Sequence, residues 1–150
     1  MKKIFVILVL IVAVCFLTCC NNSPKEYVYD EDFAEFSIDG NLSWLQGTWK
    51  LDKWTTVNNG VEENNTDIYE YKQLVIQGTT KDAVLLEQGK SKYDTKPFSY
   101  EYTVQSYLTL NNHEQGHSNQ VNKEKSMLLL IRQSYLGPQV LYYTTYKKQK

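Results

Sequence analysis

Apolar and polar residues alternate with a period of two along much of the chain. From residue 45 onward, Leu45, Gly47, Trp49 and Leu51 alternate with polar residues. Successive side chains of a β-strand point to opposite faces, so this alternation predicts a strand over residues 44–57 with one buried and one wet face. An asparagine–glycine turn signal follows at residues 58–60, and a polar loop is expected to continue to residue 67.

The strongest alternation lies farther along, between residues 98 and 110. Polar residues separate the members of its apolar face, which are Phe98, Tyr100, Tyr102, Val104, Leu108 and Leu110. A helix would scatter these residues around its axis, so the pattern predicts β-structure. Because the segment is long for one strand, we expect a tight turn or bulge near residues 105–106.

Weaker patterns predict the remaining elements. Strands are expected over 68–77, with a bulge near Gln73, and over 83–88, 127–132 and 140–146, with a turn at 89–90 and a polar loop at 111–124. Residues 33–38 fit a short strand or a helical turn. Since no long amphipathic helix separates the strands, we predict an all-β antiparallel up-and-down barrel of about eight strands over residues 44–150. The rival fold, a β-sandwich, usually needs longer connections.

The N-terminus has the order of a secretory signal peptide, which we assign to residues 1–19. Two lysines precede an apolar run from Ile4 to Leu17, and polar residues with a proline follow it. The alternative is a membrane-spanning anchor, but the run is shorter than the roughly 18 to 20 apolar residues that a span requires.

The end of the apolar run, Leu17-Thr18-Cys19-Cys20, resembles a bacterial lipobox. The resemblance implies that Cys20 is lipidated, with Cys19 as the second choice, and that residues 20–43 are the lipidated cysteine and a flexible tether. The expected location is the bacterial cell envelope, with the protein held at the outer membrane by its N-terminal lipid. Ordinary secretion is the alternative.

Gly47-Thr48-Trp49 resembles the G-x-W signature of lipocalin-like bacterial lipoproteins, at the place where that family carries it. The resemblance implies a lipocalin-like barrel whose floor is plugged by Trp49. In lipocalins a late arginine stacks on this tryptophan, and the chain's single arginine, Arg132, could form that pair; an outward Arg132 on a wet face is the alternative.

The composition limits which kinds of site and partner the chain can have. No cysteine follows Cys20, which excludes a disulfide framework or a cysteine metal site from the mature chain. Basic and acidic residues are interspersed and there is one arginine, so no nucleic-acid partner is expected. His113-Glu114-Gln115-Gly116-His117 matches the zinc-protease spacing, but its neighbours disfavour the helix that such a site needs. We therefore expect no enzyme activity, no catalytic residue, no metal and no cofactor.

The expected function is that of a lipid-anchored protein that binds or carries a small apolar ligand. The candidate ligand-binding residues are Phe98, Tyr100, Tyr102, Val104 and Leu108, since an aromatic wall with hydroxyl tips suits a small amphipathic molecule. Small barrels are often filled by their own side chains, so the same residues could instead be core. In that case the protein would be an interaction or scaffold module for an envelope protein.

Overall fold

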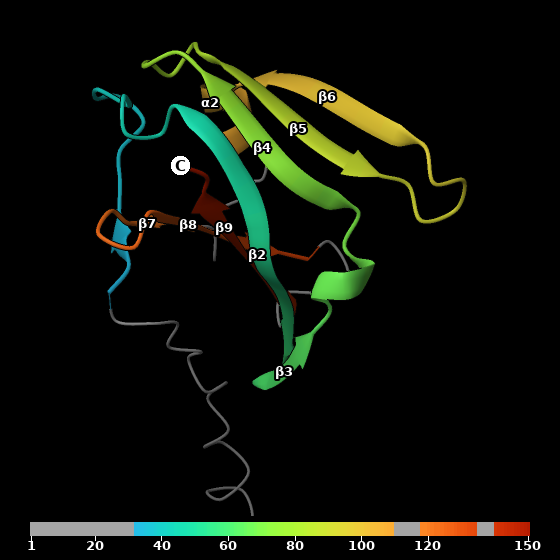
Figure 1. The fold of residues 1–150 in the computed structure, drawn as a ribbon. Coiled ribbons are helices and arrows are strands. Elements are labelled where there is room, and N and C mark those ends of the chain that lie inside the picture. The colour runs from blue at the N-terminus through green and yellow to red at the C-terminus, as the bar shows by residue number, and fades with distance from the viewer. Residues whose placement is uncertain (1–31, 110–117, 135–139) are drawn as a thin grey trace, which may run out of the picture.

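The computed structural model describes residues 32–109, 118–134 and 140–150, which form one antiparallel sheet with two short helices (Figure 1). The strands are β1 (Ala34–Glu35), β2 (Gly47–Asn58), β3 (Val61–Asn64), β4 (Tyr71–Gln77), β5 (Val84–Lys90), β6 (Pro97–Thr103), β7 (Ser118–Asn122), β8 (Met127–Gln133) and β9 (Val140–Lys148). The helices are the 3-10 helix η1 (Thr66–Ile68) and the α-helix α2 (Val104–Thr109).

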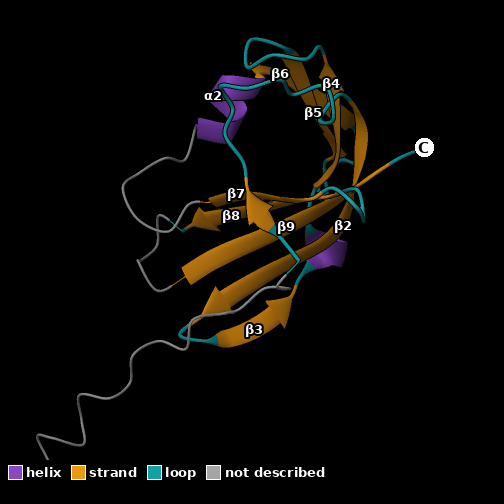
Figure 2. Ribbon diagram, turned by 90° about the vertical axis from the view of Figure 1, so that its left-hand side faces the viewer, coloured by secondary structure: helices purple, strands orange, loops and turns teal. Residues whose placement is uncertain are grey.

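The strands follow the order β1-β7-β8-β9-β2-β4-β5-β6, and β3 pairs with β2 beyond the end of β4. All pairings are antiparallel, which confirms the predicted all-β antiparallel class. Figure 2 shows the sheet curling so that β4, β5 and β6 lie across from β7, β8 and β9. The two ends of the order, β1 and β6, do not pair, so the described strands do not form the closed barrel that we predicted.

Helix α2 stands beside the open edge left by β6 (Figure 2). It begins directly after β6, and the Asn119 side-chain amide on β7 donates a hydrogen bond of 3.2 Å to the Leu108 carbonyl oxygen in α2. The predicted continuation of β-structure from residue 98 to residue 110, with a turn or bulge near 105–106, is therefore wrong over residues 104–109, which are helical. Val104 and Leu108 are four residues apart, a spacing that also fits one face of a helix, and Thr103 Oγ1 caps it by accepting the Ser106 N–H at 3.0 Å.

A β-bulge in β2 changes which residues face inward. Leu51 lies opposite Tyr146 on β9, but the register shifts at Asp52, so that Trp54 lies opposite Thr144. Opposed residues share a face, and Tyr146 and Thr144 are two apart on β9. The concave face therefore carries the odd-numbered residues of β2 before the bulge and the even-numbered ones after it.

Several predicted element boundaries differ from those in the structure, for identifiable reasons. The predicted loop at 58–67 contains β3 and η1, because Asn59 and Gly60 both adopt positive φ (50° and 79°) and form a tight hairpin turn. The predicted loop at 111–124 contains β7, whose polar composition hides its period. β5 continues through the predicted turn at 89–90, where Gly89 has no side chain and leaves room for the Phe98 ring. The predicted bulge near Gln73 is confirmed.

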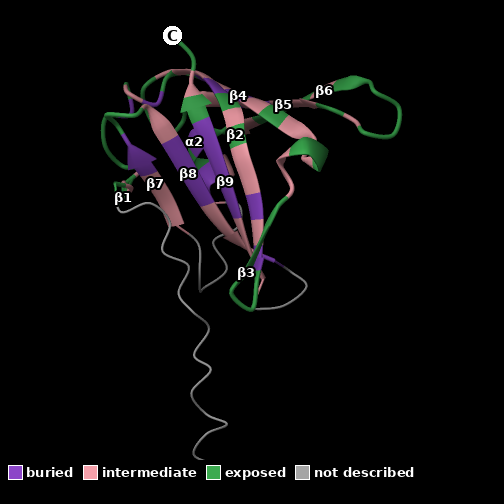
Figure 3. Ribbon diagram, turned by 60° about the horizontal axis from the view of Figure 1, so that its bottom comes forward, coloured by how far each residue is buried: buried purple, intermediate pink, exposed green. Residues whose placement is uncertain are grey.

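The main core lies on the concave face, and Trp49 is its largest fully buried side chain, 1% exposed, as predicted. Its buried members are Leu42, Leu45, Trp49, Leu74, Ile76, Ala83, Leu85, Val104, Leu108, Leu128, Leu130 and Tyr146. Figure 3 shows buried stretches along β7, β8 and β9. A smaller cluster of Val57, Leu129 and Tyr143 lies on the opposite face. Burying a side chain as large as that of Trp49 stabilises the fold by about 3 to 5 kcal/mol, judged from the usual cost of truncating one to alanine.

The G-x-W segment is held by the end of the last strand. The Trp49 indole N–H donates to the Leu45 carbonyl oxygen at 2.7 Å, and the Lys148 ammonium lies 5.4 Å from the centre of the Trp49 ring. Lys148 reaches this position across Gly47, where a Cβ would come within 3.2 Å of Lys148 Cε, and it donates to the Trp44 carbonyl oxygen at 2.6 Å. The cation over Trp49 is thus Lys148, in place of the Arg132 that the resemblance implied.

Candidate functional site

A cavity of about 270 Å³ opens on the concave face, on the side of the main core where the bulge of β2 brings Trp54 opposite Thr144. Its walls come from five elements and from the segment between η1 and β4. The lining residues are Tyr69, Glu87, Tyr102, Tyr107, Leu130, Arg132 and Thr144. Aromatic rings and one leucine supply apolar surface, while a carboxyl, a guanidinium and several hydroxyls supply polar atoms. Such a mixture is typical of pockets for small molecules.

Strand register brings these residues to one face. Leu130 on β8 lies opposite Thr144 on β9, and Arg132 lies two residues further along β8. On the other side of the curled sheet, Glu87 on β5 and Tyr102 on β6 belong to the same alternation as the buried Leu85. Tyr107 reaches the cavity from α2, so the helix that replaces the predicted strand forms part of the wall.

Glu87 is a nearly buried acid, 8% exposed. Its carboxylate accepts a hydrogen bond of 2.7 Å from the Tyr107 hydroxyl. Burial raises the pKa of Glu87 above its ordinary value of 4.5, and the hydrogen bond from Tyr107 opposes that change only in part. The protonated form of this carboxyl is therefore favoured more than that of an exposed glutamate.

Three tyrosine hydroxyls surround the deep end of the cavity. Burial, together with the charge of Glu87, raises the pKa of Tyr69 to about 12, and burial raises the pKa values of Tyr107 and Tyr146 well above 10.0. All three hydroxyls therefore keep their protons near neutral pH and act as hydrogen-bond donors. Tyr146 is fully buried behind the lining residues, and its hydroxyl makes no hydrogen bond to any described atom.

Arg132 places a cation in the cavity wall. It donates to the Ile131 carbonyl oxygen at 3.0 Å and to the Asn119 side-chain oxygen on β7 at 2.9 Å. Burial lowers the pKa of Arg132, but a guanidinium stays protonated in proteins. Within the described residues, neither Arg132 nor Glu87 takes part in an ion pair.

A continuous row of aromatic rings extends from the cavity to the exposed edge of the sheet. Neighbouring ring centres are 4.7 to 5.8 Å apart along the series Tyr142, Trp54, Tyr69, Tyr71, Phe98 and Tyr100. Trp54 is stacked between Tyr69 and Tyr142, which fixes the Tyr69 ring in the cavity wall. The row ends at Tyr100, which is 50% exposed.

The predicted ligand-binding residues are divided between the wall and the core. Phe98, Tyr100 and Tyr102 share one face of β6, but of the three only Tyr102 lines the cavity, and the other two lie in the aromatic row. Val104 and Leu108 are buried core residues of α2. Cys20, the signal peptide and the 113–117 motif lie outside the described residues.

Sequence reasoning missed most of the polar wall. It indicated Arg132 only as a partner for Trp49, and Tyr69, Glu87, Tyr107 and Thr144 were not predicted as site residues. Glu87 carried one usable signal, because it directly follows the apolar residues Val84-Leu85-Leu86 in a predicted strand. An acid within such a strand is unusual unless it faces a polar interior or the solvent.

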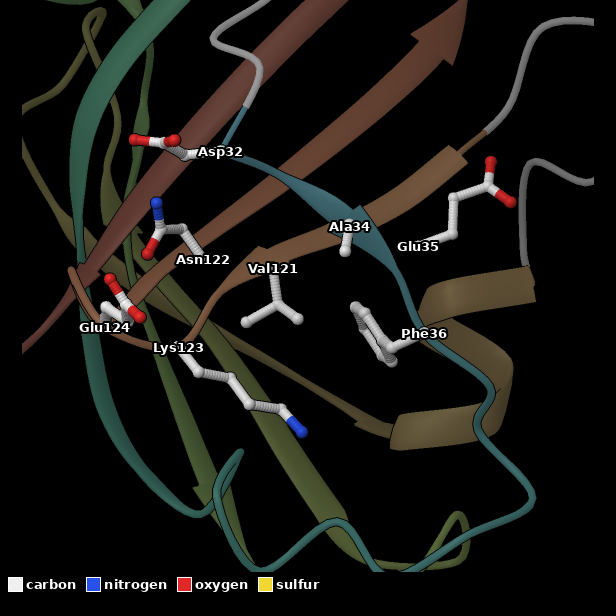
Figure 4. Close-up of a pocket in the computed structure, with 8 residues that line it drawn as sticks. All are labelled: Asp32, Ala34, Glu35, Phe36, Val121, Asn122, Lys123 and Glu124. Carbon is white, nitrogen blue, oxygen red and sulfur yellow. The ribbon is translucent and has the colours of Figure 1, made fainter.

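A second hollow, of about 420 Å³, lies beside the edge strand β1 (Figure 4). It is lined by Asp32, Ala34, Glu35, Phe36, Val121, Asn122, Lys123 and Glu124. Figure 4 shows Val121 and Phe36 in its centre, with Lys123 extending alongside them. Its charged lining residues, Asp32, Glu35, Lys123 and Glu124, are all exposed, so it has no buried charged group of the kind found in the concave cavity.

Comparison of the chain with protein-family models, curated proteins and solved structures finds no match. In the part of the chain that the structure describes, no cluster of three or more histidine, cysteine or acidic residues could hold a metal ion. None of the described helices is long and apolar enough to cross a membrane.

Replacement of Glu87 by glutamine should change how stability depends on pH. Folding raises the pKa of Glu87. At pH values below about 4.5 the carboxyl is protonated in both the folded and the unfolded chain, so it costs the folded state no free energy. As the pH rises through the folded-state pKa, the wild-type protein becomes progressively less stable. The glutamine side chain can still accept the Tyr107 hydrogen bond without carrying a charge. Urea unfolding should show Glu87→Gln gaining free energy of unfolding over wild type as the pH increases.

The matched control is Glu101→Gln, an exposed acid on the opposite face of β6. The difference in free energy of unfolding between Glu101→Gln and wild type should stay nearly constant over the same pH range. If the free energy of unfolding of Glu87→Gln differs from that of wild type by an equally constant amount, the claim that burial raises the pKa of Glu87 is contradicted.

Proposed function

We propose that this protein binds a small amphipathic molecule in the concave cavity. The observation that carries the proposal is the combination of a buried carboxyl, a guanidinium and protonated tyrosine hydroxyls around one space of about 270 Å³. Buried polar groups are costly unless they serve hydrogen bonding, so a lining that served only as core would be expected to be apolar. A ligand with one polar end and a flat apolar body matches this wall better than the purely apolar ligand expected from the sequence.

The fold that would hold this ligand resembles a lipocalin-like barrel with one side left open. The support is the position of Gly47 and Trp49 at the packed floor and the long antiparallel order of strands above it. α2 and the β6 edge would then form the rim of the opening. Assignment to the lipocalin-like bacterial lipoproteins remains our proposal.

We also propose that the domain is attached to the bacterial cell envelope by a lipid on Cys20, with the outer membrane as the expected location. The lipobox-like Leu17-Thr18-Cys19-Cys20 supports this proposal. In a chain attached this way, the tether would join the folded domain at Asp32, beside the β7–β8 turn, where Asp32 pairs with Lys125.

An interaction module is the second candidate function. Its support is the larger hollow beside β1, next to the expected tether, which is more open to a protein partner than the concave cavity. In this case the concave cavity would hold only water, and a neutral aromatic probe should not bind there.

Binding of 2-naphthamide, a neutral flat molecule, tests the ligand-binding proposal. Titration calorimetry should show saturable binding with one site per chain, and Thr144→Met, which adds bulk inside the cavity, should weaken it about tenfold or more. Thr48→Met, on the opposite face of β2, should bind as wild type does. Absence of binding, or equal binding by the Thr144 variant, would contradict the proposal.

Labelling of the full-length chain with radioactive palmitate in a bacterial host tests the anchor. Wild-type protein should be labelled, and Cys20→Ala should lose the label, because the thiol that accepts the diacylglycerol is gone. Cys19→Ala should keep it. Label that survives in Cys20→Ala but disappears in Cys19→Ala would move the site, and an unlabelled wild-type chain would refute the anchor.

A further inference from the structure

The Arg132 charge lacks a counter-ion in the wall that surrounds it. Both of its hydrogen-bond acceptors, the Ile131 carbonyl and the Asn119 side-chain oxygen, are neutral. A guanidinium has five N–H donors, so these two bonds leave donors available. Charges inside proteins are usually paired, since removing an ion from water is costly.

Glu87 does not fill this role, although it lines the same cavity. Its carboxylate accepts from the Tyr107 hydroxyl and forms no ion pair with a described residue. A cation in contact would lower the pKa of Glu87, whereas burial raises it. Glu87 and Arg132 therefore line the same cavity without contacting each other.

Tyrosine hydroxyls in the same wall can donate hydrogen bonds to a ligand. Tyr69 and Tyr107 keep their protons near neutral pH, and Tyr107 alone donates to Glu87. The Tyr146 hydroxyl is completely buried and lies close enough to the Tyr69 and Tyr107 hydroxyls to shift their pKa values, without a well-formed hydrogen bond to a described atom. A ligand acceptor would fix the direction of the Tyr69 O–H and leave the Tyr69 oxygen as an acceptor for Tyr146.

We propose that the cavity binds a small organic monocarboxylate, with its carboxylate against Arg132 and the Tyr69 hydroxyl and its flat body between Tyr102 and Leu130. This inference rests on the proposed function and adds the chemical class of the ligand. The planar guanidinium matches a carboxylate, to which it can donate two parallel hydrogen bonds.

The cavity and its other lining groups limit the size and the charge of this carboxylate. At about 30 Å³ for each water, a cavity of about 270 Å³ has the volume of about nine waters, and bonded atoms lie closer together than separate waters, so the cavity has room for an aromatic acid of one or two rings. Glu87 lies in the same wall and would repel a second negative charge, which favours a monoanion over a phosphate ester. Tyr102 and Tyr107, with ring centres 5.4 Å apart, provide aromatic surface for the body.

The test compares 2-naphthoate with 2-naphthamide, which has the same shape and no charge, by calorimetry on the folded chain near neutral pH. The acid should bind at least about tenfold more tightly than the amide, as expected for hydrogen bonds to a charged group. Tyr69→Phe keeps the ring stacked on Trp54 and removes only the hydroxyl, so it should weaken naphthoate binding several-fold and leave naphthamide binding nearly unchanged. Arg132→Gln should remove the preference for the acid altogether.

Two controls keep this result interpretable. Lys90→Gln removes one exposed positive charge outside the cavity, and its preference for the acid should equal that of wild type. Because Arg132 also holds Asn119, circular dichroism and thermal unfolding must show that the Arg132 variant is folded; if it is not, the Tyr69 variant decides. Equal affinity of wild-type protein for acid and amide would overturn the carboxylate proposal and leave the ligand-binding proposal standing. If neither probe binds, both proposals fail.

Discussion

The extra residue in β2, Asp52, is the constraint on which the rest of the structure depends. β2 is the strand shared by both halves of the sheet: it pairs with β9 along most of its length and with β4 and then β3 on its other side. A regular strand would keep Trp49 and Trp54 on opposite faces. The bulge instead turns both indoles toward the concave face, so that one strand supplies the largest ring of the packed core and the ring that stacks on Tyr69 of the cavity wall.

The floor and the wall differ in how their polar atoms are satisfied. At the floor, the Trp49 N–H and the Lys148 ammonium both donate to backbone carbonyls, and the surrounding side chains are apolar. Above it, Glu87 and Arg132 hydrogen-bond only to neutral groups of the described chain, and the Tyr146 hydroxyl makes no well-formed hydrogen bond there. Buried polar groups that are not fully satisfied are expected at binding sites, because a ligand can complete the hydrogen bonding.

The all-β class, the antiparallel order and the burial of Trp49 could be predicted, since period-two alternation reports the local backbone and the apolar face together. The α2 segment could not be predicted from the same signal, because Val104 and Leu108 fit either a strand with a turn or a short helix. β7 was not predicted, because its residues are mostly polar and show no apolar alternation. The openness of the sheet depends on long-range pairing between the ends of the strand order, on which single-strand patterns carry no information.

The site was less predictable than the fold. Tyr102 was predicted because the aromatic alternation of β6 marks it, but Glu87 and Arg132 line the same cavity from strands that lie far apart in the sequence. That shared face carries the proposed function, and the bulge at Asp52 turns Trp54 onto it, where this ring stacks on Tyr69 of the cavity wall. Nuclear Overhauser contacts of the Trp54 indole protons test this register most directly. The account predicts contacts to the rings of Tyr69 and Tyr142, whereas contacts to Tyr143 or Leu141 on the opposite face would contradict it.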